Sequence, residues 1–302
     1  MRFTKISFTL LLTLILAVSC ERSSTPSAPR DDQDTTVTLS KSAKRGLSYN
    51  LKDAADMDTL RSGVSWWYNW YFHTDAPEGY YDDYDMEFIP MLWGGNTSSA
   101  SMTAARTFIL DHPEIEYLLV MNEPNLTDQA NRTPGQAVTD WLIYEQFLFD
   151  LANNDGRELK LVGPAMSWGT MSGYSDPVVW LDTFYATYQA SQGRDPRIDY
   201  LAFHWYDYGL SQQLDHLQKY GKQIWITEMA NWNPNIDSYS KQIVQMIEMV
   251  AICESRDDVF RYAWFIGRGG LPDNHYTYLF NQESGDLNNL GYTYINLPYT
   301  NQ

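Results

Sequence analysis

The chain has 302 residues and a formal net charge of −17, from 38 acidic and 21 basic residues. This acidic balance argues against nucleic acids and anionic membrane surfaces as partners, because both bind clustered cations. A hydrophobic fraction of 44% excludes a disordered chain. Aromatic residues are abundant, with 11 Trp, 22 Tyr and 12 Phe. Because buried Trp and Tyr need hydrogen-bond partners, this excess predicts an aromatic-lined groove at the surface.

The N-terminus has the pattern of a targeting signal. Two basic residues precede an apolar stretch, 6–18, that is too short to span a bilayer. The sequence Ala-Val-Ser-Cys at 17–20 resembles the lipobox of bacterial lipoproteins, which implies removal of residues 1–19 and lipidation of Cys20. Ordinary secretion is the alternative. Residues 20–44 are rich in Ser, Thr, Pro and Asp and predict a flexible tether. We therefore expect a protein of the bacterial envelope, periplasmic or surface-facing, that meets the membrane only through this anchor.

Short β-rich runs alternate with helical patterns from Arg45 onward. The predicted strands are 45–50, 64–70, 87–93, 117–123, 160–166, 200–206, 223–228 and 261–266. The clearest predicted helices are 103–110, 178–190, 211–220, 238–254 and a long one from Thr133-Pro134 to about 153–156. Eight alternations over about 250 residues predict a single-domain α/β fold, a (β/α)8 TIM barrel over 45–302. A doubly wound sheet is the competitor, but no Gly-rich dinucleotide fingerprint follows the first strand.

Two carboxylates lie at predicted strand ends, where barrels place their chemistry. Glu123 ends the fourth apolar run and Glu228 ends the seventh, so the two face each other across the barrel mouth. One protonated and one ionised carboxyl are the usual pair for cleaving a glycosidic bond. For either Glu alone, a helix cap or a structural ion pair is the alternative.

The remaining strand ends carry aromatic and amide side chains and almost no cations. They are Tyr49, Trp67, Trp70, Trp93, Asn122, His204, Tyr206 and Trp264. Flat rings suit the C–H faces of sugars, because they add contact area without demanding hydrogen bonds. Core packing is the alternative for Trp67, Trp70 and Trp93, as is a satisfied core histidine for His204. The five histidines have no metal-ligand spacing and no phosphate loop occurs, so we expect neither metal nor cofactor.

Seven segments, in order, resemble glycoside hydrolase family 128, the β-1,3-glucanases of the large barrel clan. They are RGLSYN at 45–50, WWYNW at 66–70, PMLWG at 90–94, MNEPN at 121–125, GPA at 163–165, FHWY at 203–206 and ITE at 226–228. The resemblance covers nearly the whole domain. The loop 267–298 has no matching segment.

The resemblance implies a retaining, endo-acting hydrolase in which Glu123 is the acid/base and Glu228 the nucleophile. It also implies that Asn122 holds the sugar 2-hydroxyl in subsite −1, that Trp264 forms the platform there, and that Tyr206 or His204 bonds Glu228. The expected partner is a β-glucan polysaccharide or oligosaccharide, bound by a monomer. The alternatives are a retaining β-glycanase for mannan or β-1,4-glucan, and a non-catalytic glycan-binding lipoprotein.

Overall fold

The computed structural model describes residues 41–95 and 98–300, which lie in one compact unit. The predicted signal peptide, Cys20 and residues 20–40 of the predicted tether lie outside the described residues. Within the described part, no helix combines the length and apolar character needed to cross a bilayer.

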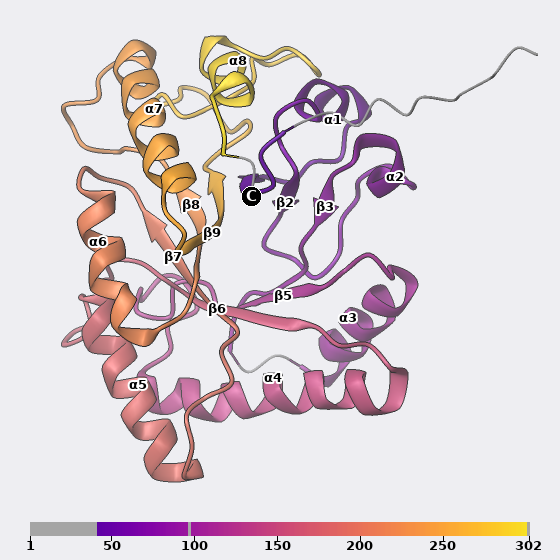
Figure 1. Cartoon of the computed structure of the whole chain (residues 1–302), viewed down its shortest axis with the longest axis vertical. Coiled ribbons are helices and arrows are strands. Elements are labelled where there is room, and N and C mark those ends of the chain that lie inside the picture. Colours follow the sequence, from indigo (N-terminus) through magenta and orange to yellow (C-terminus); the bar gives the residue numbers. More distant parts are fainter. Residues whose placement is uncertain (1–40, 96–97, 301–302) are drawn as a thin grey trace, which may run out of the picture. The chain divides into compact units, whose positions relative to one another are not determined.

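A parallel sheet of nine strands forms the centre of the described residues (Figure 1). Its order is β3-β2-β1-β9-β8-β7-β6-β5-β4. The strands are β1 (Arg45–Ser48), β2 (Trp66–Tyr68), β3 (Glu87–Phe88), β4 (Met91–Leu92), β5 (Tyr117–Val120), β6 (Lys160–Met166), β7 (Tyr200–Trp205), β8 (Ile224–Met229) and β9 (Val259–Trp264). All eight predicted strands are present, with ends that differ by a few residues.

The sheet curls into a barrel, and the strands at its two ends, β3 and β4, follow each other in the sequence. β3 pairs with β2, and β4 pairs with β5. Pro90 lies between β3 and β4 and has no N–H to donate, so the predicted third strand is split in two. Ile89 N donates to Trp67 O at 2.9 Å, and Leu119 N donates to Pro90 O at 3.0 Å, which ties this stretch to both neighbours. The single-domain α/β barrel is therefore confirmed.

Helices surround the outside of the sheet (Figure 1). They are α1 (Ala54–Leu60), α2 (Tyr80–Tyr84), α3 (Ser99–Asp111), α4 (Pro134–Asp155), α5 (Pro177–Gln192), α6 (Leu210–Leu217), α7 (Tyr239–Ser255) and α8 (Asn289–Asn296). α4 starts with a capping box between Thr133 and Gln136, as the Thr-Pro pair predicts. The sequence did not single out α1, α2 and α8. α1 and α2 have only 7 and 5 residues, too few for a clear helical repeat, and α8 lies in the segment 267–298 that the resemblance did not match.

Side chains of alternate residues point into the barrel or out toward the helices. The interior cluster includes Trp66 and Tyr68 of β2, Leu119, Trp225 and Ala263. The larger outer cluster contains their sequence neighbours, among them Trp67, Ile226 and Trp264. A Cβ on Gly46 would lie 2.2 Å from the Trp66 ring, so only glycine at this position lets that indole fill the interior.

The last residues of the predicted tether belong to the folded unit. Ser42 and Lys44 are buried. Ser42 Oγ donates to Glu254 Oε1 at 2.5 Å, and Lys44 Nζ donates to the carbonyls of Cys253 and Arg256 at 3.2 and 2.9 Å. Lys41 Nζ donates to Val64 O at 3.1 Å. The prediction that the tether extends to residue 44 is therefore wrong for residues 41–44, because their side chains bond other parts of the folded unit.

Candidate active site

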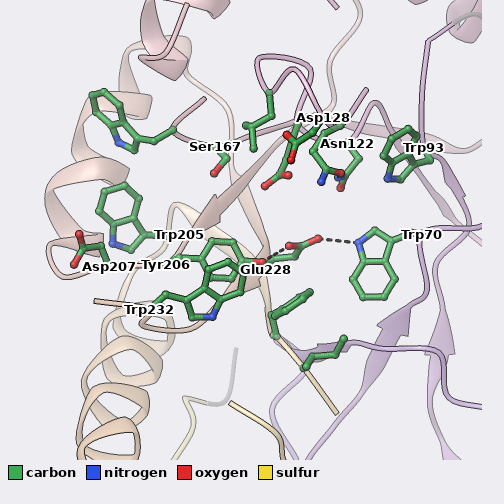
Figure 2. A pocket seen from close by; sticks show the side chains of 16 residues that line it. Trp70, Trp93, Asn122, Asp128, Ser167, Trp205, Tyr206, Asp207, Glu228 and Trp232 are labelled. Carbon is green, nitrogen blue, oxygen red and sulfur yellow. Dashed lines mark hydrogen bonds between the residues drawn. The ribbon is translucent and has the colours of Figure 1, made fainter. Parts of the chain in front are cut away.

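A cavity of about 920 Å³ opens at the carboxyl ends of the strands (Figure 2). Its aromatic wall consists of Trp70, Trp93, Trp168, Trp205, Tyr206, Trp232 and Phe265. Its polar lining consists of Asn122, Glu123, Asp128, Gln129, Ser167, Asp207 and Glu228. Leu126 and Ile266 complete it. The lining thus combines four carboxylates with stacked rings and includes no Lys or Arg.

Glu228 lies within β8 and receives hydrogen bonds from three side chains. Tyr68 Oη and Trp70 Nε1 each donate to Oε1 at 2.8 Å, and the hydroxyl of Tyr206 donates to Oε2. Figure 2 shows Trp70 and Tyr206 reaching the carboxylate from opposite sides. Burial, followed by the charge of Glu228, raises the pKa of both tyrosines well above the ordinary value, so both remain protonated donors. Three donors converging on one carboxylate suit a group that acts as an anion.

Glu123 follows β5 on a backbone that departs from an extended strand. Met121 and Glu123 have φ angles of 59° and 45°, in the left-handed region that side chains other than glycine rarely occupy. The hydrogen bond from Glu123 N to Ala165 O, at 2.8 Å, helps to hold this conformation. Such backbone costs about 1–3 kcal/mol per residue and is characteristic of functional sites. Its effect is to bring Asn122 and Glu123 into the cavity together.

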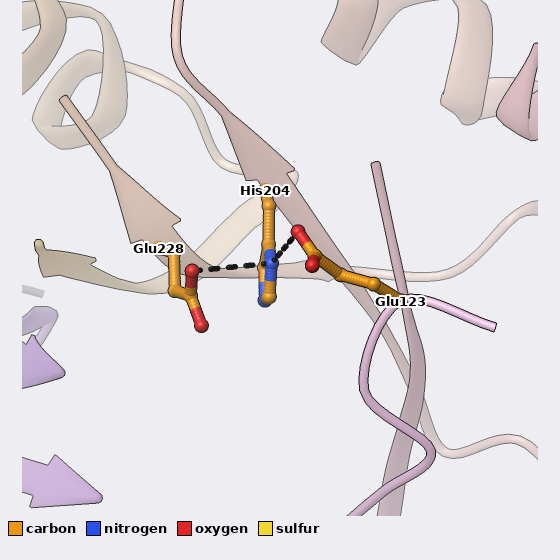
Figure 3. A group of neighbouring side chains, drawn as sticks. All are labelled: Glu123, His204 and Glu228. Carbon is orange, nitrogen blue, oxygen red and sulfur yellow. Dashed lines mark hydrogen bonds and ion pairs between the residues drawn. The ribbon is translucent and has the colours of Figure 1, made fainter. Parts of the chain in front are cut away.

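His204 links the two carboxylates (Figure 3). Its Nδ1 lies 2.9 Å from Glu123 Oε1 and 3.4 Å from Glu228 Oε2. One ligand atom from each of these three residues lies within 4.8 Å of the others. Burial alone would lower the pKa of His204, but the charge of Glu228 and the hydrogen bond to Glu123 raise it above the ordinary value. The imidazole is therefore a positively polarised donor between two acids.

The same three side chains could in principle ligate a cation. A ligating histidine usually donates its second ring nitrogen to an oxygen. His204 Nε2 is buried without a hydrogen-bond partner among the described residues. Both oxygens of Glu228 already accept protein hydrogen bonds. This donor set fits a hydrogen-bonded acid pair better than a metal centre.

Replacing His204 by Asn should remove a pH dependence of stability. Because the folded-state pKa of His204 lies above the ordinary value near 6.5, its protonation stabilises the fold fully below about pH 6.5. That stabilisation is lost as the pH rises through the folded-state pKa. We expect the free energy of unfolding, from urea titrations, to fall over this window more steeply in the wild type than in His204→Asn. Exposed His216→Asn is the control, and parallel wild-type and His204→Asn curves would contradict the prediction.

The structure brings most of the predicted site residues together. Asn122, Trp70, Trp93 and Tyr206 line the cavity with the two glutamates, and the buried His204 lies between the two glutamates. Asn122 is almost fully buried, and its Oδ1 accepts no hydrogen bond from the described residues. This acceptor next to Glu123 is thus buried without a hydrogen-bond partner among the described residues.

Besides His204, three predicted binding residues lie outside the cavity lining. Trp67 is fully buried against Tyr80 and Phe88, in the outer core. Trp264 is also fully buried, and its Nε1 donates to Thr277 O at 2.9 Å. The predicted sugar platform at Trp264 is therefore wrong, since this indole points outward, and the next residues along the chain, Phe265 and Ile266, line the cavity instead.

Tyr49 packs against Gly267 rather than against the cavity. Its hydroxyl accepts a hydrogen bond from Arg268 Nη1 at 3.3 Å. The predicted contact with a glycan is replaced by a contact with the loop after β9.

Sequence reasoning missed Tyr68, which is the second tyrosine donor to Glu228. It lies between Trp67 and Trp70, which the sequence analysis did select. Tyr68 points into the barrel whereas Trp67 points outward, and the sequence did not show which of the two faces inward. Trp168 and Trp232 were missed too, because they lie in the loops after β6 and β8, and so was Trp205, the last residue of β7. High tryptophan content was the one signal for them.

A pair of close carboxylates at the mouth of an α/β barrel, among aromatic rings, defines the chain as a glycoside hydrolase. Residues 46–294 match the family model described as "Glycosyl hydrolase catalytic core". The chain belongs to this group and, more specifically, to glycoside hydrolase family 128.

Two solved structures support this assignment. A subgroup II endo-β-1,3-glucanase of family 128 from Pseudomonas viridiflava is 50% identical, with a TM-score of 0.79, and the match covers 86% of this chain and 100% of that one. A subgroup II endo-β-1,3-glucanase from Sorangium cellulosum is 33% identical, with a TM-score of 0.71, and the match covers 85% and 99%.

A curated relative is alkali-sensitive linkage protein 1 of Schizosaccharomyces pombe, which is 29% identical over 270 residues. That match covers 84% of this chain, but the chain spans only 44% of that relative's length.

Proposed function

We propose that this chain is a retaining endo-β-1,3-glucanase. The observation that carries the proposal is the carboxylate pair with its shared histidine, on a chain 50% identical to an endo-β-1,3-glucanase. The polymer would lie along the cavity between the tryptophans, and an internal linkage would lie above Glu123 and Glu228.

The reaction would proceed by double displacement. Glu123 protonates the glycosidic oxygen while Glu228 attacks the anomeric carbon, and a covalent glycosyl-enzyme forms. Glu123, now a carboxylate, then takes a proton from water as that water attacks the anomeric carbon, and the bond to Glu228 breaks to release Glu228 as a carboxylate. One oxygen of each carboxylate lies within 4.8 Å of the other. That separation supports retention, which requires carboxyl groups about 5–5.5 Å apart, rather than inversion at about 6.5–9.5 Å.

The surrounding residues would position the sugar and the nucleophile. The side-chain amide of Asn122, which lines the cavity, would hydrogen-bond the 2-hydroxyl, a contact that strengthens in the transition state. Trp70 and Tyr206 would hold Glu228 at the angle of attack through their hydrogen bonds. Trp93 and Trp168, each partly exposed, would supply stacking surfaces.

The direct test is a panel of polysaccharides, with release of reducing ends and product sizes as readouts. We expect mixed oligosaccharides from laminarin and curdlan and far less release from mannan and cellulose derivatives. Four cavity carboxylates without a lining Lys or Arg also predict weaker cleavage of carboxymethylated curdlan than of curdlan, with a difference that narrows as salt is added. Faster cleavage of mannan or β-1,4-glucan would contradict the proposed specificity for the β-1,3 linkage. Binding without release on every polymer would favour a non-catalytic glycan-binding protein.

We also propose that the protein is a lipid-anchored monomer of the bacterial envelope. The support is the 17–20 sequence with Cys20, together with the acidic surface, which repels other copies at low salt. Labelled palmitate should enter the full-length chain but not Cys20→Ser, and sedimentation of the chain from residue 41 should give one protomer. Equal labelling of the wild type and of Cys20→Ser would contradict the proposed lipidation of Cys20.

A further inference from the structure

Three aromatic rings form a continuous stack at one side of the cavity. The ring centroids of Tyr206 and Trp232 lie 4.1 Å apart with an interplanar angle of 29°. Those of Trp232 and His275 lie 4.6 Å apart with an angle of 19°. Both faces of Trp232 are therefore covered, one by a residue that bonds the proposed nucleophile and the other by a loop histidine.

His275 comes from the loop after β9, the part of the chain that matches no segment of the family resemblance. The backbone of His275 is fixed at two points: its N–H donates to Asp273 Oδ1 at 3.1 Å, and its carbonyl accepts from Gln242 Nε2 of α7 at 2.9 Å. Its imidazole has no hydrogen bond within the described residues and makes its ring contact with Trp232 alone. The loop therefore places this exposed imidazole on the indole, and stacking holds it there.

Exposure alone does not show which tryptophans a sugar can use. Trp93 and Trp232 both line the cavity, and both are 37% exposed. Trp93 and the more exposed Trp168 stack on no other described ring, whereas Trp232 is covered on both faces. A pyranose ring stacks on an indole only where a face is bare. Trp232 therefore offers its edge to the cavity and no platform.

We propose that His275 closes one end of the glucan-binding cleft at Trp232. It would thereby limit how many glucose residues the enzyme binds on that side of the catalytic glutamates. Its imidazole occupies the indole face on which one more glucose would stack. This inference rests on the proposed glucanase function and adds to it a residue that determines product length. The loop between β9 and α8 is thereby assigned a role in chain-length specificity.

The test compares His275→Ala with His275→Phe. Both remove the imidazole, but Phe keeps a ring over Trp232. The readout is the ratio of kcat/KM for a long laminari-oligosaccharide to that for a short one, so a general loss of activity cancels. In His275→Ala we expect this ratio to rise by about tenfold, equal to about 1.4 kcal/mol, and the products to lengthen by one glucose. His275→Phe should keep the wild-type ratio.

A double variant, His275→Ala with Trp232→Ala, identifies the source of the gain. The ratio should return to the wild-type value, because the newly exposed face is gone. An unchanged ratio in a folded His275→Ala protein, a rise of equal size in His275→Phe, or a gain that survives loss of Trp232 would each overturn the inference. A wild type that cleaves no laminari-oligosaccharide overturns the proposed function instead. In that case, oligosaccharide binding is measured for Glu228→Gln and for the double variant Glu228→Gln with His275→Ala. Equal affinities for a long oligosaccharide would overturn this inference too.

Discussion

Glu228→Ala should lower kcat on laminarin by at least about 10⁴-fold while leaving oligosaccharide binding nearly intact. The carboxylate is the only group in the site with three converging donors, which marks it as the anion that attacks carbon. Removing it takes away the covalent step and leaves the tryptophan surfaces in place. Reducing-end release measures the loss, and tryptophan fluorescence titration with laminari-oligosaccharides measures the binding.

Two variants make that result specific. Glu248→Ala changes an exposed glutamate on α7 that is not part of the cavity lining, and should keep wild-type activity. Tyr206→Phe removes one donor to Glu228 and should give a smaller loss than Glu228→Ala, because Tyr68 and Trp70 still bond the carboxylate. Wild-type turnover by Glu228→Ala would exclude Glu228 as the nucleophile.

Glu123→Ala should have the second-largest effect, and its size should depend on the leaving group. General acid catalysis contributes about 10²–10⁴-fold, so hydrolysis of laminarin should fall by that factor. An aryl β-laminaribioside with an activated phenol needs no protonation, so its glycosyl-enzyme should still form and then accumulate. The burst of released phenol in a stopped-flow assay measures this step.

Azide assigns the two roles independently. Azide needs no general base, so it should restore turnover of the aryl glycoside by Glu123→Ala and give a β-glycosyl azide. In Glu228→Ala it should attack from the vacated side and give an α-glycosyl azide. The configuration of each product can be read by NMR. A β-azide from Glu228→Ala and an α-azide from Glu123→Ala would exchange the two assignments.

The positions of the strands and of both catalytic candidates could be predicted because they depend on local patterns. Apolar, β-branched runs separated by capped helices set the alternation, and the carboxyl end of each run follows from chain direction. Capping at Thr133 and Asp176 was readable for the same reason, since each side chain bonds an N–H two or three residues away. Such interactions join residues that are close in the sequence, so sequence patterns are enough to predict them.

Which face each strand-end residue presents could not be predicted. Trp225 points into the barrel, so plain alternation would send Glu228 outward. The register of β8 against β9 shifts between Ile226 and Met229, and this irregularity turns Glu228 into the cavity. On β5 the left-handed φ of Met121 does the same for Asn122. On β2, and on β9 from Tyr262 to Trp264, the side chains alternate regularly, so Trp67 and Trp264 point outward.

The amino-acid sequence by itself determined the barrel, the two strands that carry the glutamates, and the chemical class of the site, because these follow from residue types and their spacing. The tertiary structure alone decided that His204 joins both carboxylates, that Tyr68 rather than Trp67 serves the site, and that His275 covers Trp232. Each of those contacts joins residues far apart in the chain, or depends on a bulge whose position is set by packing against neighbouring strands. Neither the long-range contacts nor the positions of the bulges can be inferred from neighbouring residues in the sequence.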